Sequence, residues 1–149
     1  MTRRIRLVTP GRADPAPIAE LCLPAMDRTT PVILSRVLGA LRRSGYGQMC
    51  DTVQIVLAEA LNNVAEHAYP AVALGAVAVR VDTQAAHLRI RITDWGLPVP
   101  PATLAGCSAP DPLELAEGGY GWFLIRSLVA DLAYGRQVCR NDLILRLDM

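Results

Sequence analysis

The stretch that decides the fold is Glu59-Ala-Leu-Asn62-Asn63-Val-Ala-Glu66-His67, together with the apolar residues interleaved with it. Those apolar residues recur at spacings of three and four: Val53, Val56, Leu57, Ala60, Leu61, Val64 and Ala68. This periodicity predicts a helix over residues 53–68 with one buried stripe. We expect Asp51 or Thr52 to cap it and Pro70 to stop it.

Carboxylate and carboxamide side chains occupy the other side of this helix. At about 100° per residue, four of them fall within roughly 100° of arc: Glu59, Asn62, Asn63 and Glu66. Such a strip of oxygen atoms suits Mg²⁺ with phosphates, and Glu59 could serve as a general base. Taken alone, the strip is more often an ordinary solvent-exposed face, although two adjacent asparagines are unusual there. His67 continues the strip, and we expect it to be a structural hydrogen-bonding residue.

Patterning predicts one sheet and two further helices around this element. Strands are predicted by alternation at residues 5–8, 18–23, 77–81, 88–92, 132–138 and 143–147, with the arginines of the central pair facing away from the core. A first helix is expected to start at Thr29-Thr30-Pro31, with a hydroxyl cap and Pro at its first position. Its apolar stripe consists of Val32, Ile33, Val37, Leu38 and Leu41. The last helix opens at Gly118 and runs through Val129. Together these elements predict an α+β fold in two layers.

Composition describes one globular domain over residues 1–149. Apolar residues make up 52% and charged residues 19%, and the net charge is +1. A dedicated nucleic-acid binder normally has a clustered basic excess, so nucleic acid is not an expected partner. The sequence contains no Lys, which excludes lysine-dependent catalysis, and no apolar run approaches the roughly 18 to 20 residues of a membrane span. The four cysteines are scattered, and together with the absence of a signal peptide this favours reduced thiols in a cytoplasmic protein.

Two further motifs could bind a ligand. Asp94-Trp-Gly96 ends a predicted strand, where the carboxylate can accept a hydrogen bond from an exocyclic amino group such as that of adenine. Gly96 would let a flat ring approach the backbone, although a strand-ending turn would explain the same residues. Gly118-Gly119-Tyr-Gly121 places backbone N–H groups at a helix start, which suits di- or triphosphate, although a flexible loop would explain the glycines equally well. Between these motifs, the proline-rich residues 97–117 have the length of a functional loop, and we expect a lid.

The order of these motifs resembles the Bergerat-fold ATPases, and most closely the bacterial anti-sigma-factor serine kinases. Glu59 to Tyr69 resembles the N-box of that group, Asp94-Trp-Gly96 its first glycine box, and the run from Gly119 to Leu128 its second. The likeness covers roughly residues 30 to 149. It implies a two-layer α/β sandwich whose mixed, mostly antiparallel sheet is covered on one face by helices.

The resemblance also implies a role for each matching residue. Asn63 would coordinate Mg²⁺ between the phosphates of ATP, and Glu59 would be the base that activates a partner's serine. Asp94 would bind the adenine amino group with Gly96 beside the ring, and Gly119 and Gly121 would donate N–H groups to the phosphates. The implied partners are a small anti-sigma antagonist that accepts the phosphate and a sigma factor, and because relatives pair, a homodimer is a further expectation.

One departure from that family bears on mechanism. From Ile92 to Ile125 there is no Arg, Lys or His, so the lid has no basic side chain to hold the γ-phosphate unless Arg126 or the N-terminal region supplies one. Because phosphoryl transfer depends on stabilising charge on the transferred oxygens, ATP binding is expected more strongly than transfer. An ATP-gated protein-binding module is therefore the alternative to a kinase. A detached histidine kinase domain is a third interpretation, but the sequence has no phospho-accepting His helix.

Overall fold

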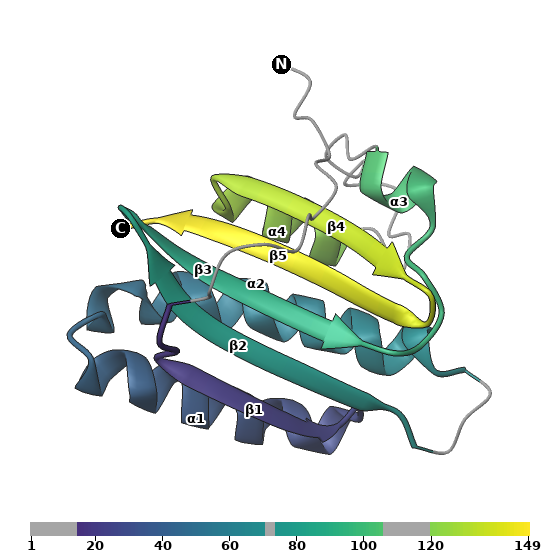
Figure 1. Cartoon of the computed structure of the whole chain (residues 1–149), viewed down its shortest axis with the longest axis horizontal. Coiled ribbons are helices and arrows are strands. Elements are labelled where there is room, and N and C mark those ends of the chain that lie inside the picture. Colours follow the sequence, from purple (N-terminus) through teal and green to yellow (C-terminus); the bar gives the residue numbers. More distant parts are fainter. Residues whose placement is uncertain (1–14, 71–73, 106–119) are drawn as a thin grey trace.

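The computed structural model describes residues 15–70, 74–105 and 120–149, and in these segments a sheet and a helical layer pack face to face (Figure 1). The strands are β1 (Ala19–Pro24), β2 (Ala76–Gln84), β3 (His87–Asp94), β4 (Asp131–Gln137) and β5 (Arg140–Asp148). The helices are α1 (Thr30–Arg43), α2 (Cys50–Asn63), α3 (Pro101–Ala105) and α4 (Tyr120–Leu128), with short turns of helix at η1 (Asp27–Thr29), η2 (Gly47–Met49) and η3 (Val64–Ala68). This is the predicted α+β sandwich, and none of its described helices is long and apolar enough to cross a bilayer.

The sheet has the strand order β1-β2-β3-β5-β4, and every described pairing is antiparallel. The last strand of the sequence, β5, therefore lies inside the sheet, between β3 and β4. This order sets Asp94, the last residue of β3, directly opposite Asn141 of β5. Asn141 in turn faces Arg136 near the end of β4. Asp94 thus meets two polar residues of the distant β4–β5 hairpin at one end of the sheet.

The core lies between the sheet and the helices α1, α2 and α4, which cover the same face (Figure 1). All seven residues of the predicted α2 stripe are buried, because α2 packs between α1 and α4 as well as on the sheet. On α1 the predicted stripe is buried except for Val32, which is 44% exposed on the side away from the core.

The predicted helix caps are wrong, because neither α1 nor α2 has a side-chain cap hydrogen bond. α2 begins at Cys50, so Asp51 and Thr52 lie inside its first turn rather than before it. Thr29 ends η1, and its hydroxyl donates to the carbonyls of Pro24 and Met26 (2.6 and 2.8 Å) rather than capping α1. Pro31 does lie in the first turn of α1, as predicted. The strand expected at residues 5–8 lies outside the described residues.

The arginines of β2 and β3 point away from the helices, as expected, but not all of them are solvated. Arg89 is 9% exposed and forms a two-pronged ion pair with Asp82, with Nε and Nη2 each 2.8 Å from a carboxylate oxygen. The two residues face each other across the β2–β3 pair. The guanidinium and carboxylate match in geometry, and this compensates for taking both charges out of water.

The end of the long helix departs from the predicted regular helix. α2 ends at Asn63, and Val64–Ala68 form a turn of π-helix. The last carbonyls of a helix have no partner within it, and here the Ala68 carbonyl accepts a hydrogen bond from Leu97 N at 2.7 Å. Just beyond, the Tyr69 hydroxyl donates to Ala76 O (2.7 Å) and accepts from Trp95 N (2.8 Å). The helix end is thereby fastened to the start of β2 and the end of β3.

Tyr69→Phe tests this fastening. Removing the hydroxyl leaves one carbonyl and one N–H without their partner, so we expect a loss of about 1–2 kcal/mol in the free energy of unfolding. Tyr46→Phe is the control, because the Tyr46 hydroxyl bonds to none of the described residues although its ring also packs on the core. Urea titrations of the two variants should differ by that amount, and equal midpoints would contradict the role given to Tyr69.

Candidate functional site

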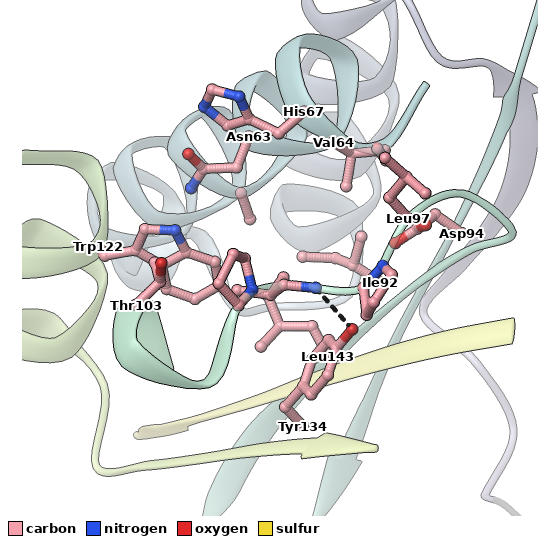
Figure 2. A pocket seen from close by; sticks show the side chains of 15 residues that line it. Asn63, Val64, His67, Ile92, Asp94, Leu97, Thr103, Trp122, Tyr134 and Leu143 are labelled. Atoms are coloured by element: carbon pink, nitrogen blue, oxygen red, sulfur yellow. Dashed lines mark hydrogen bonds between the residues drawn. The ribbon is translucent and has the colours of Figure 1, made fainter. Parts of the chain in front are cut away.

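A cavity of about 360 Å³ opens between the end of α2 and the sheet (Figure 2). Its wall is mostly apolar, with a few polar side chains: Asn63, His67, Asp94, Thr103 and Tyr134. In Figure 2, Asn63 and His67 lie on the helical side, and Tyr134 and Leu143 lie on the sheet side. An apolar hollow with a few fixed polar groups is the usual form of a small-molecule site.

Asp94 is the buried charge of this cavity. Only 7% of the residue is exposed, and its Oδ1 accepts from Asn141 Nδ2 (2.7 Å) and Gly96 N (2.9 Å). Burial raises the pKa of Asp94 above its ordinary value of 3.8, while these two donors act in the opposite direction. Because both bonds end on Oδ1, Oδ2 is the oxygen to which a ligand in the cavity can donate.

A second group of residues holds Asn141, which is itself 1% exposed. Its Oδ1 accepts from Arg136 Nη1 (2.6 Å) and from the Tyr134 hydroxyl (2.9 Å). The same hydroxyl accepts from Val99 N (3.0 Å), the bond dashed in Figure 2. Burial raises the pKa of Tyr134, so the hydroxyl stays protonated and can donate at neutral pH. The carboxylate, the amide, the guanidinium and the phenol therefore form one connected network.

Gly96 packs against the end of the helix. A Cβ there would overlap the backbone carbonyl of Ala68, so glycine is required where the helix end and the strand end approach closely. Gly96 is not among the residues that line the cavity, and its place beside an adenine ring stays a prediction. Its own carbonyl accepts from Arg136 Nη1 at 3.0 Å.

The structure brings the other predicted residues together at the start of α4. Glu59 is half-buried, and its Oε2 lies against Gly121, where a Cβ would be only 2.5 Å away. Glu59 and Gly121 do not line the cavity themselves, but their neighbours Ala60 and Trp122 do. Asn63, one turn further along α2, lines it directly, and its buried Nδ2 has no hydrogen-bond partner in the described protein.

Some predicted features lie outside the described residues. These are Gly119 and residues 106–117 of the expected lid. The first part of that segment is described, and Leu97, Pro98, Val99, Pro100 and Thr103 line the cavity. Among the described residues there is no group of three or more His, Cys, Asp or Glu side chains that could hold a metal.

Sequence reasoning missed the network behind Asp94. One signal was present for Asn141, because it shares a strand face with Leu143, Leu145 and Leu147 and is the polar member of a buried row. For Arg136 and Tyr134 there was no signal, since their role depends on the insertion of β5 between β3 and β4.

The chain belongs to the histidine kinase-like ATPase domain family, whose model matches residues 23–147. It is similar to a protein of Oceanobacillus iheyensis named serine-protein kinase RsbW, with 27% identity over an alignment 124 residues long that covers 79% of this chain and 78% of the relative. Among solved structures it is similar to the Acinetobacter baumannii histidine kinase AdeS, with 11% identity and a TM-score of 0.47, covering 87% of this chain and 68% of that one.

Asp94→Asn tests the burial of this carboxyl group. Because burial raises its pKa, the folded protein holds the proton more tightly than the unfolded chain, and the stability this provides is lost as pH rises through the folded pKa. An asparagine Oδ1 can accept the same two hydrogen bonds without a charge. We therefore expect the variant to gain stability relative to wild type as pH rises from 4 to 8.

Chemical denaturation at several pH values measures this difference. Asp27→Asn is the control for a lost surface charge, because Asp27 is exposed and forms no ion pair with the described residues. A variant that instead loses stability relative to wild type toward pH 8 would show that Asp94 is stabilised as a charge.

Proposed function

We propose that the chain is an ATP- and Mg²⁺-dependent serine protein kinase of the anti-sigma-factor type. The observation that carries the proposal is the position of three polar side chains around one apolar cavity. The Asp94 carboxylate lies buried in its wall, the Asn63 amide lines it without a partner among the described residues, and Glu59 lies beside it at the start of α4. Membership of the ATPase family and the similarity to a serine-protein kinase support the same function.

The adenine base would occupy the apolar part of the cavity. A volume of about 360 Å³ is within the range of ligand pockets, roughly 300–1,000 Å³. The free Oδ2 of Asp94 would accept a hydrogen bond from the amino group of adenine. A carboxylate that is held by two protein donors and excluded from water discriminates strongly between donors and acceptors on the ligand.

Asn63 fits the role of a magnesium ligand. Its amide is partly buried at the cavity wall and makes no hydrogen bond to the described residues, so the oxygen is not engaged in the fold and Nδ2 is left for a ligand acceptor. The amide oxygen is a ligand type that Mg²⁺ accepts, with phosphate oxygens and water in the remaining positions. When bound, the cation would neutralise charge on the phosphates.

Glu59 would act on the protein substrate. In the transfer step its carboxylate takes the proton from a serine hydroxyl, the serine oxygen bonds to the γ-phosphorus, and the bond to the β-phosphate oxygen breaks to release ADP. Gly121 allows the carboxylate to lie against the start of α4, because any side chain there would displace it. The backbone N–H groups of Gly119 and Gly121, at the entry to α4, would bind the phosphates.

A second candidate, an ATP-gated binding module, is favoured by one observation. None of the residues lining the described cavity is Arg or Lys, and the sequence between Ile92 and Ile125 has none either. With less charge to stabilise the transferred phosphoryl group, binding would persist where turnover is slow. In this case ATP would change the affinity for a partner protein without phosphorylating it.

The partners we propose are a small antagonist protein carrying the acceptor serine and a sigma factor, with a second copy of the chain as a further partner. We place the protein in the cytoplasm, where the described cysteines Cys22, Cys50 and Cys139 would stay reduced, as they are here.

Glu59→Gln tests the kinase directly. The amide cannot accept the serine proton, so we expect phosphate transfer to a cognate antagonist to fall about 10²- to 10⁴-fold while ATP affinity stays within about twofold. Glu66→Gln is the matched control, because Glu66 is an exposed carboxylate seven residues further along the same helical segment.

Transfer of labelled phosphate and calorimetric titration with ATP are measured on both variants. Undiminished transfer in Glu59→Gln would exclude Glu59 as the base. Background transfer in the wild-type protein, together with partner affinity that differs between ATP and ADP, would establish the binding module instead.

A further inference from the structure

We propose that Arg136 is a positioning residue that makes the cavity select adenine over purines with an oxo group at position 6. It would do so by fixing the orientation of the Asn141 amide that faces Asp94. This inference rests on the proposed nucleotide site and adds to it the residue that determines its base specificity.

The geometry gives Arg136 two anchors. The residue is exposed near the end of β4, yet its Nη1 donates both to Asn141 Oδ1 (2.6 Å) and to Gly96 O (3.0 Å). Gly96 lies two residues beyond Asp94, in the loop that follows β3. The guanidinium of Arg136 therefore bridges this loop and the side-chain amide of Asn141. A guanidinium has only hydrogen-bond donors, so the atoms that face it must be acceptors.

An asparagine amide can adopt two orientations that differ only in which atom, oxygen or nitrogen, faces a given neighbour. With Arg136 on one side, the oxygen must face the arginine, and Nδ2 therefore faces Asp94 Oδ1 at 2.7 Å. Tyr134 supports this orientation, because its hydroxyl already accepts from Val99 N and directs its own proton to Asn141 Oδ1. The nitrogen makes two further contacts, to Leu97 O (3.1 Å) and Gly96 O (3.3 Å).

This orientation determines what Asp94 can recognise. A carboxylate that receives a donor from Nδ2 is stabilised in its ionised form and can only accept, so it pairs with the amino group of adenine and repels an oxo group. If the amide turned over, its oxygen would face Asp94 and favour the protonated carboxyl, which can donate to a 6-oxo purine. Arg136 would thus act on specificity without touching the base.

The groups around Asp94 act in both directions. Burial, the largest effect, and the Asp142 carboxylate of β5 raise the pKa of Asp94, whereas the hydrogen bonds from Asn141 and Gly96 and the charge of Arg136 lower it and favour the ionised form. Tyr69 and Tyr134 are close by, and burial raises the pKa of each, so both are neutral at pH 7. On the helical side His67 lines the same cavity, and on β2 the residue opposite Asp94 is the apolar Val77.

The experiment compares the affinities for ATP and for inosine triphosphate, which carries the 6-oxo group, by calorimetry from pH 5.5 to 8. In Arg136→Gln we expect the ratio of the two affinities to fall about tenfold at pH 7, the size of losing one well-made charged contact. As the pH is lowered, the preference for ATP over inosine triphosphate should also disappear at a higher pH in Arg136→Gln than in the wild-type protein. Arg146→Gln is the control, because this arginine lies toward the other end of β5, beside Asp131, and should change the ratio less than about twofold.

Two further variants separate orientation from charge. Asn141→Asp keeps an acceptor for Arg136 and Tyr134 but presents an oxygen to Asp94, so the ratio should fall although Arg136 is intact. In Asn141→Ala there is no amide to orient, so adding Arg136→Gln should change the ratio less than about twofold. An equal loss with and without the amide would show a direct charge effect and overturn the proposal.

The outcomes distinguish this proposal from the one on which it rests. If the wild-type protein prefers ATP and Arg136→Gln keeps the full preference, or Asn141→Asp leaves the ratio unchanged, the role of Arg136 is refuted and the nucleotide site stands. If the wild-type protein binds no ATP in the presence of Mg²⁺, both proposals are refuted.

Discussion

A carboxylate kept out of water at the end of β3 is the constraint on which the rest of the site depends. Asp94 could not remain there without donors, and the fold supplies them from Gly96 on its own loop and from Asn141 on the neighbouring strand. Asn141 is held in turn by β4, so three strands contribute to one buried charge. The strand order of the sheet, with β5 inside, is what makes this possible.

A second constraint sets the cavity beside that charge. The Ala68 carbonyl, at the end of the π turn Val64–Ala68, accepts from Leu97 N, and only glycine at position 96 allows the two chains to come so close. One and two turns before this junction, within α2, Asn63 lines the cavity and Glu59 lies against the start of α4. The junction thus fixes the end of the helix that carries the residues whose chemistry we assign to the nucleotide and to the acceptor serine.

Much of the fold could be predicted from the sequence because buried residues recur at the spacing of a helix or of a strand. The stripe on α2 and the alternation of β2 and β3 each mark which side of an element faces the core. The helix caps could not be predicted, since Thr29 and Asp51 look like caps but make no cap hydrogen bond. The network of Arg136, Tyr134 and Asn141 depends on strand order, which no local pattern contains. Asp94 was identified by its place at a strand end, whereas the close packing of Gly96 under Ala68 required the structure.

The most direct test of the central claim is a titration of the ¹⁵N-labelled protein with Mg²⁺ and ATP, followed by NMR. A nucleotide in this cavity should give its largest chemical-shift changes at the side-chain amides of Asn63 and Asn141 and at the backbone amides of Gly96 and Leu97. Shifts confined to the sheet face that carries Arg89 and Asp82, or no shifts at millimolar ATP, would contradict a nucleotide site between α2 and the sheet.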